Sequence, residues 1–324
     1  MATIENSDVV RTRSDAAGTS TFVTGHFPQR PWVVVGVGAL VGFLFTVIWS
    51  AAFVDSEIGD RVANTVLGYD AKETAIGGIW AGIAFAFAAG LACTFTACNV
   101  AAFGMIGPLL GTADSRRAQL ARTLRPLGWL SVGMISISAA YGVLVGLFGT
   151  KMPQFSTASV APGAMSPRNW QSLVTFGVIG LVMIYLGLAA AGLVPDPFRR
   201  IAQRWPNAPM VIMGVLIGAL TIGRPFGLYR KLFRDAAESG NVFYGAAAWT
   251  LHSIGNILVM VVVFLALVYG TRGRFQRWLT ERPSRLTAFM IIGFVAAGVF
   301  TFLYWDVRAL ANRDILPWYP MIKW

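Results

Sequence analysis

Histidine, cysteine and charge are all scarce in this sequence. The 324 residues include two His and two Cys, and Asp, Glu, Lys and Arg together make up 13%, whereas a soluble domain has about 25% charged residues. Two Cys and two His do not suffice for a typical protein-only zinc site, and two Cys in one apolar run are not a disulfide framework of the secreted kind. No cofactor is expected.

Several catalytic motifs are also missing. GxxxxGK[ST], HExxH and GxSxG do not occur, which argues against P-loop, zincin and α/β-hydrolase chemistry. The first 31 residues lack an early apolar run, and the first apolar segment is too long for a signal-peptide core, so it is expected to be a retained helix. The apolar segments contain no Asp or Glu, which disfavours a carboxylate proton relay of the usual pump type.

Long apolar segments are what the chain does have. Hydrophobic residues make up 56%, and a membrane span needs about 20 mostly apolar residues. Seven segments qualify, which predicts an all-α polytopic membrane protein with the lipid bilayer as its first partner: 32–54, 77–112, 127–149, 169–194, 208–223, 243–270 and 286–305.

The net charge is +11, and the basic residues are unevenly divided between the connections on the two sides of the predicted spans. If odd-numbered connections are cytoplasmic, residues 1–31, 113–126, 195–207 and 271–285 carry 15 of the 26 basic residues, while 55–76 is acidic. Because Arg and Lys in short loops set orientation, we expect a bacterial-type inner (cytoplasmic) membrane, with the N-terminus cytoplasmic and the C-terminal tail 306–324 external. The charge then reflects topology, and no nucleic-acid partner is expected.

A short internal repeat indicates how the spans are organised. Ser131, Gly133 and Ile135 of the third span align with Ser253, Gly255 and Ile257 of the sixth. In the sequence, each of the two aligned spans comes after a span that is expected to be interrupted and before one further span. We therefore predict an extra helix, 32–54, followed by two three-helix repeats, 77–194 and 208–305, which are inverted because each has an odd number of spans. Small residues recurring at ordinary helix contacts are the alternative interpretation.

The first span of each repeat is predicted to be broken. Residues 88–111 contain both cysteines, Cys93 and Cys98, together with Asn99, four glycines and a proline, and the fifth span ends at Arg224-Pro225. Weakened backbone at membrane depth persists only where protein or a water-filled cavity satisfies its polar groups. Residues 228–238 then form an amphipathic pattern typical of a helix in the headgroup region.

Residues 95–101, Phe-Thr-Ala-Cys-Asn-Val-Ala, are similar to the F-T-P-C-x-x-P motif of the cytochrome c biogenesis / thiol-disulfide interchange family (the CcdA and DsbD type). The resemblance covers about 77–305. It implies two inverted three-helix repeats, with one cysteine from each forming a central disulfide that takes electrons from cytoplasmic thioredoxin and passes them outside. The chain departs from the motif at Ala97 and Ala101, and Arg224-Pro225 stands where the second cysteine is expected.

Six residues are candidates for the site. Cys98 is predicted to be a redox thiol or a soft-metal ligand, the alternative being a small buried hydrophobe. Cys93 can pair with Cys98 only if the helix is interrupted between them, since five helical residues rise about 7.5 Å. Asn99 lies beside Cys98 and is expected to join it.

His252 and Asn256 share one face of the sixth span and are candidates for binding, or for a hydrogen bond across helices. Arg224 is predicted either to bind an anion or to extend to the interface. We further predict that His252 shares a polar pocket with Cys98 and Asn99, where it could stabilise a thiolate or bind a metal ion together with Cys98.

Three functions remain open. The first is a membrane thiol-disulfide, electron-transfer protein acting through Cys98, with thioredoxin-like partners on either side of the membrane. The second is a transporter of a soft metal ion or small solute on the same fold. The third is a non-catalytic membrane subunit. The missing second-repeat cysteine weighs against the first, and the polar sixth span weighs against the third.

Overall fold

The computed structural model describes residues 22–23, 25, 27–93, 116–157, 163–224, 226–270, 274, 278, 281–317 and 319; the side chains of 52, 93, 116–123, 267, 268 and 283 lie outside the description. Within these ranges the chain is helical and has no strand. The predicted all-α class is confirmed, and several helices have the apolar character of a membrane protein.

Seven main helices coincide with the predicted spans, the second being described only to Cys93. They are α1 (Pro31–Ile48), α4 (Ile79–Cys93), α6 (Arg116–Phe148), α7 (Pro167–Ala190), α9 (Ala208–Ala219), α11 (Val242–Gly270) and α13 (Pro283–Thr301). Five are long and apolar enough to cross a membrane, and α9 with its bent continuation makes a sixth if counted as one span. At 15 residues, α4 is shorter than the usual span of about 20.

Several predicted boundaries were wrong. α1 ends at Ile48 rather than 54, because Trp49 is extended and the Ser50 hydroxyl accepts a hydrogen bond from the Phe53 backbone, so that a new helix begins. The predicted loop 55–76 contains the π-helical segment η1 (Val54–Asp60) and α3 (Arg61–Leu67).

At the other end of the chain, α13 continues through a second π-helical segment, η6 (Phe302–Val307), and α14 (Arg308–Ala311). The candidate span of Ser284–Ala311 therefore contains Asp306. The expectation that no apolar span carries a carboxylate was wrong, because the predicted span ended one residue before it.

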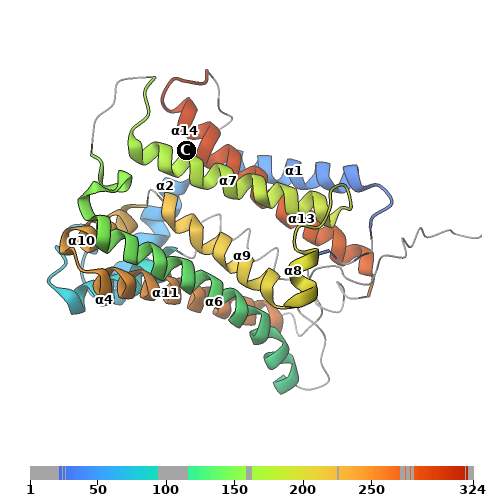
Figure 1. Cartoon of the computed structure of the whole chain (residues 1–324), viewed down its shortest axis with the longest axis horizontal. Helices are drawn as coiled ribbons and strands as arrows, with labels where there is room; N and C mark the ends of the chain where they lie inside the picture. The colour runs from blue at the N-terminus through green and yellow to red at the C-terminus, as the bar shows by residue number, and fades with distance from the viewer. Residues whose placement is uncertain are drawn as a thin grey trace, which may run out of the picture.

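The helices pack in two connected groups (Figure 1). α13 lies between α1 and α7, and α6 lies between α9 and α11, while α4 packs on α11. One apolar core joins α6, α7, α9, α11 and α13, and a second joins α3, α4, α6 and α11 with the helix that follows α9.

Glycines bring two helix pairs to backbone contact. On α6, a Cβ at Gly133 would overlap the carbonyl oxygen of Val211 and lie 2.9 Å from the nitrogen of Val215 on α9. On α11, a Cβ at Gly255 would lie 2.5 Å from the carbonyl oxygen of Phe87 and 3.0 Å from the nitrogen of Leu91 on α4. Both aligned Ser-x-Gly segments thus lie at close helix contacts.

The same contacts give helix directions. Contacts advance together along α4 and α11 (Gly82 with Tyr244, Gly90 with His252), and likewise along α6 and α9 and along α1 and α13. Contacts run in opposite senses along α6 and α11 (Gly142 with Gly245, Gly146 with Val242) and along α7 and α13. These parallel and antiparallel pairs are the ones expected if the seven helices alternate in direction along the chain.

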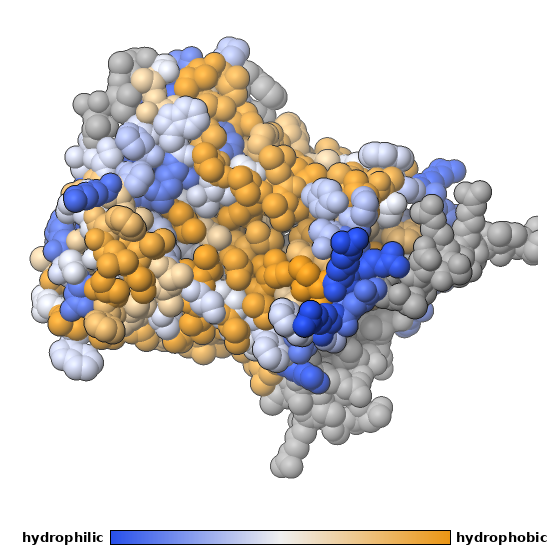
Figure 2. Space-filling model, viewed as in Figure 1, coloured by the Kyte–Doolittle hydropathy of each residue, from blue (hydrophilic) through white to orange (hydrophobic). Residues whose placement is uncertain are grey.

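Large apolar side chains remain exposed on the long helices. Trp32 and Leu40 on α1, Trp170 and Val178 on α7, and Val262 on α11 are each at least half exposed. Figure 2 shows apolar surface across the middle of the visible face, with hydrophilic residues gathered toward its two ends. An apolar band between polar ends is the surface expected for contact with lipid.

Candidate functional site

The chain turns sharply after α9. The one-turn 3₁₀ segment η5 (Leu220–Gly223) follows α9, Arg224 is extended, and α10 (Gly227–Ser239) leaves at 85°. The predicted interruption near 222–226 is confirmed. Pro225 lies outside the described residues, as do 96–108, where the other interruption is predicted.

Side chains from elsewhere satisfy the backbone at this turn. The Ile222 carbonyl oxygen accepts hydrogen bonds from Nε2 of Gln154 (3.0 Å) and of Gln171 (2.9 Å). The Gly223 carbonyl oxygen accepts one from Oγ of Ser172 at 2.6 Å. A non-helical backbone at membrane depth requires such partners, so the break is supported by the α7 side of the bundle.

Arg224 lies inside the protein at the break, with 4% of its surface exposed. It borders a small cavity of about 10 Å³, together with Trp49, Asp55, Phe226 and Trp305, which is about the least volume that holds one water molecule. This burial does not fit an arginine that extends to the interface, the alternative interpretation of this residue.

Asp55 is the acidic residue at the same cavity, and it comes from η1. Burial raises the pKa of its carboxyl group to about 6, against the opposing influence of the Arg224 guanidinium. Trp305 also lines this cavity; it belongs to η6 and stacks on Phe176 with ring centroids 4.8 Å apart. Two π-helical segments and a broken helix thus meet at one cavity, and such bulges are frequent at functional sites.

Asp306 adds a second buried carboxyl group. It is 3% exposed, and neither carboxylate oxygen has a hydrogen-bond partner among the described residues. Its side chain faces Gly177 on α7, where a Cβ would lie 3.3 Å from Oδ1. An ionisable group at this depth marks a functional candidate by default.

His252 is enclosed by aromatic rings. It is 1% exposed, and its ring centroid lies 5.9 Å from that of Tyr229 and 5.6 Å from that of Trp249. The backbone of Ala86 on α4 faces the ring, but neither ring nitrogen forms a hydrogen bond of normal geometry within the described part of the chain. Arg224 lies within electrostatic range of the ring.

A chain of contacts runs from the break toward His252. Besides Ile222, Gln171 donates to the Tyr141 hydroxyl at 3.5 Å. Tyr141 packs edge-on against Trp249 with ring centroids 5.4 Å apart, and Trp249 packs in the same way against His252. The break beside Arg224 is thus linked to His252 through side chains inside the protein.

Two other predicted features of α11 can be located. Asn256 is 7% exposed, so it points inward, as His252 on the same face of α11 does. Ser253 lies between them and donates a 2.6 Å hydrogen bond to Ser138 on α6.

The predicted thiol site falls largely outside the described residues. Cys98 and Asn99 lie there, and Cys93 is described only as the last backbone residue of α4. The predicted pocket of His252, Cys98 and Asn99 is therefore untested. Within the ranges that the structure describes, no three His, Cys, Asp or Glu residues lie close enough together to bind a metal ion.

Sequence reasoning missed Asp55, Asp306, Gln171 and Ser172. Both acids stand just beyond an apolar run, where they were assigned to external segments, and their burial follows from the two π-helical segments. The two polar residues at the start of the fourth span, Gln171 and Ser172, were a signal that could have been used, because polar side chains inside a span need partners.

No family model, curated protein or solved structure matches this chain.

Proposed function

We propose that the chain consists of two inverted three-helix units, 77–194 and 208–305, preceded by the helix at 32–54. The supporting observation is that two sets of glycine contacts correspond atom by atom. Gly133 meets the oxygen of Val211 and the nitrogen of Val215, as Gly255 meets the oxygen of Phe87 and the nitrogen of Leu91.

The reverse contacts agree. A Cβ at Gly214 on α9 would overlap the carbonyl oxygen of Leu130, and a Cβ at Gly90 on α4 would overlap that of His252. Under this correspondence α4 is equivalent to α9 and α6 to α11. Extended along the chain, it pairs Ile222, at the centre of the described break, with Cys98. The arrangement is that of inverted-repeat membrane proteins, whose sites lie at interrupted helices.

On this framework we propose a membrane thiol-disulfide function, in which Cys98 passes reducing equivalents across the membrane. The single observation that carries it is the break at Ile222, the counterpart of Cys98, because an interrupted helix would also allow Cys93 to approach Cys98. Reduced thioredoxin would transfer two electrons by thiolate attack on a disulfide of Cys98, which is formed with Cys93 or with the thiol of a partner protein.

The test is a redox titration of purified wild type, Cys93→Ser and Cys98→Ser, followed by a thiol-reactive mass tag. We expect wild type to change by two tags between its oxidised and thioredoxin-reduced forms. A thioredoxin that lacks its resolving cysteine and carries a thionitrobenzoate group on the remaining one should form a mixed disulfide with Cys93→Ser, as the Cys98 thiolate attacks and thionitrobenzoate leaves, but not with Cys98→Ser. A Cys98 thiol that reacts with neither form of thioredoxin would refute the proposal.

Transport of a small anionic solute is the second candidate, and buried Arg224 at the break favours it. The guanidinium group is the usual partner of carboxylate and oxyanion groups in proteins. Counterflow of labelled phosphate, sulfate or acetate into proteoliposomes should then be supported by wild type and lost in Arg224→Gln. Equal fluxes through wild type, Arg224→Gln and empty liposomes would exclude these solutes.

A further inference from the structure

An open cleft lies along the polar face of α10. It has a volume of about 570 Å³, within the range of about 300–1,000 Å³ typical of ligand pockets. The basic residues that line it are Lys72, Arg230, Lys231 and Arg234, and the acidic ones are Asp235 and Glu238. The cleft is separate from the cavity at Arg224.

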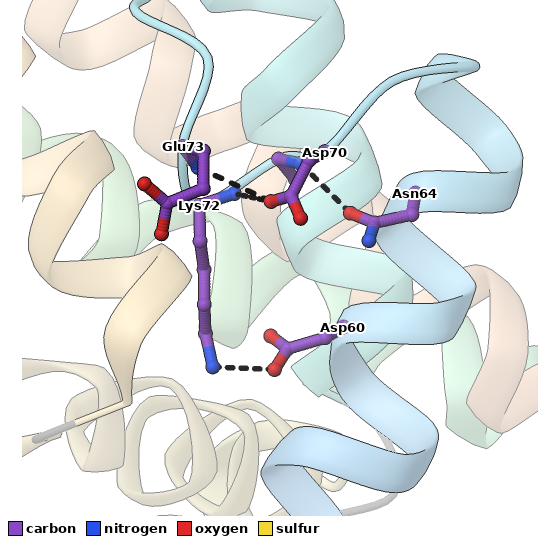
Figure 3. Close-up of polar contacts among 6 residues, drawn as sticks. Asp60, Asn64, Asp70, Lys72 and Glu73 are labelled. Carbon is purple, nitrogen blue, oxygen red and sulfur yellow. Dashed lines mark hydrogen bonds and ion pairs between the residues drawn. The ribbon is translucent and has the colours of Figure 1, made fainter.

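One wall of the cleft is rigid, because its lysines already have partners. Figure 3 shows Lys72 paired with Asp60, and the Asp70 carboxylate accepting from the backbone of Lys72 and Glu73. Lys231 donates to the carbonyl oxygens of Ala71 (2.7 Å), Lys72 (3.0 Å) and Thr74. These two charges fix the 71–74 segment against α10.

The arginines at this cleft have no acidic partner among the described residues. Arg230 and Arg234 lie one turn apart on α10, and Arg168 at the start of α7 is within electrostatic range of both, and of Arg313. All four side chains are partly buried, and none forms an ion pair with a described residue. Arg234 packs over the Phe155 ring at 4.9 Å and donates to the Phe155 carbonyl oxygen at 3.4 Å.

We propose that this cleft binds an oxyanion of the phosphate class, held by Arg230 and Arg234 with Arg168 behind them. Four like charges held close together repel one another, and a bound dianion would remove that cost. Guanidinium groups match phosphate oxygens in bidentate geometry, and the cleft is lined by four basic residues against two acidic ones, an excess that attracts anions. The site adds to the proposed thiol function and does not depend on Cys98.

The phosphate could belong to a soluble molecule or to a lipid headgroup, since α10 follows an apolar helix and Ala75 and Ile76 also line the cleft.

The first experiment measures the melting temperature of the purified protein in neutral detergent against inorganic phosphate, at constant ionic strength. The variants are Arg230→Gln with Arg234→Gln, and Lys151→Gln as the control. Lys151 is exposed and has no ion pair among the described residues.

We expect phosphate to raise the melting temperature of wild type and of Lys151→Gln saturably, and to leave the double variant unchanged. Without phosphate, the double variant should melt at or above the wild-type temperature, because repulsion has been relieved. A second arm compares nanodiscs of phosphatidylcholine with nanodiscs containing phosphatidylglycerol. If lipid is the source, the anionic lipid stabilises wild type and Lys151→Gln but not the double variant, and added phosphate gives nothing more.

The proposal fails if neither phosphate nor anionic lipid separates wild type from the double variant, or if Lys151→Gln loses the same response. Should the double variant not fold, Arg230→Lys with Arg234→Lys keeps the charge and removes bidentate binding. Phosphate affinity measured directly should then fall at least tenfold in this variant, and an unchanged affinity would overturn the proposal.

Discussion

A single methyl group at Gly90 tests whether α4 and α11 are in backbone contact. A Cβ there would overlap the carbonyl oxygen of His252 and lie 2.9 Å from its carbonyl carbon and 3.0 Å from its Cα. These are backbone atoms, so no side chain can rotate away and the helices must separate. Adding a methylene-sized group to a well-packed site costs about 1–3 kcal/mol.

The equivalent change on the other pair is Gly214→Ala, where a Cβ would overlap the Leu130 carbonyl oxygen and lie 2.8 Å from its carbonyl carbon. If the two units are equivalent, both variants should lose similar stability. Gly36→Ala on α1 and Gly128→Ala on α6 are matched controls, because nothing lies within 4 Å of either added Cβ. Each control should gain about 0.5–1 kcal/mol, the usual advantage of Ala over Gly inside a helix.

The assay is thermal unfolding in detergent, followed by tryptophan fluorescence. For domains of about 150–250 residues, 1 kcal/mol corresponds to about 2–4 °C, so Gly90→Ala and Gly214→Ala should melt several degrees below wild type, and both controls at or above it. Equal melting of Gly90→Ala and Gly36→Ala would refute the contact argument. A loss at Gly90 without one at Gly214 would refute the equivalence of the two units.

Three further predictions follow from the buried acids and the helix directions. Asp55→Asn should stabilise the protein by up to about 3 kcal/mol at pH 7.5 and by almost nothing at pH 3: the folded-state pKa of about 6 exceeds the usual 3.8, so ionisation destabilises the fold as pH rises through that window. Asp306→Asn should melt within about 2 °C of wild type or above it, because no described group pairs with the carboxylate; a drop of 5 °C or more would reveal such a partner. Reporter fusions after residues 65, 120, 160 and 200 should alternate between the two sides of the membrane, and a fusion after residue 278 should lie on the same side as that after 200; any other pattern would contradict the seven-span arrangement.

Apolar segments and strong helix breakers were the features that sequence could predict. The predicted apolar segments overlap helices, because a helix that crosses the bilayer needs about 20 apolar residues whichever helices lie beside it. The break after α9 was predictable for the same local reason, since Gly223 and Pro225 disfavour helix on both sides of Arg224. The amphipathic pattern over 228–238 also corresponds to a helix, α10.

Contacts made over long distances were beyond sequence reasoning. The apolar face of α10 was expected to lie in the headgroup region, but Leu228, Tyr229 and Phe233 are buried in a protein core. Trp305 is the last residue of the predicted seventh span, yet it lines the same cavity as Asp55. In each case the residue type is compatible with either environment, and the partner that decides between them lies far away in the chain.

The break after α9 is held by side chains of α7, which suggests a supporting role for it. Gly180 on α7 and Gly298 on α13 face each other's carbonyl oxygens, which pairs Gln171 and Ser172 with Phe289 and Met290 under the proposed correspondence. Phenylalanine and methionine side chains donate no hydrogen bonds, so these two side chains could not hold carbonyls as Gln171 and Ser172 hold those of Ile222 and Gly223. We therefore expect the break after α9 to be a fixed support, and the chemistry to belong to the first unit. Gln171→Leu would leave the buried Ile222 oxygen with one donor instead of two, and should lower stability by about 1–3 kcal/mol without changing the reactivity of Cys98 toward thioredoxin. A Gln171→Leu protein that melts normally but no longer reacts with thioredoxin would reverse this assignment.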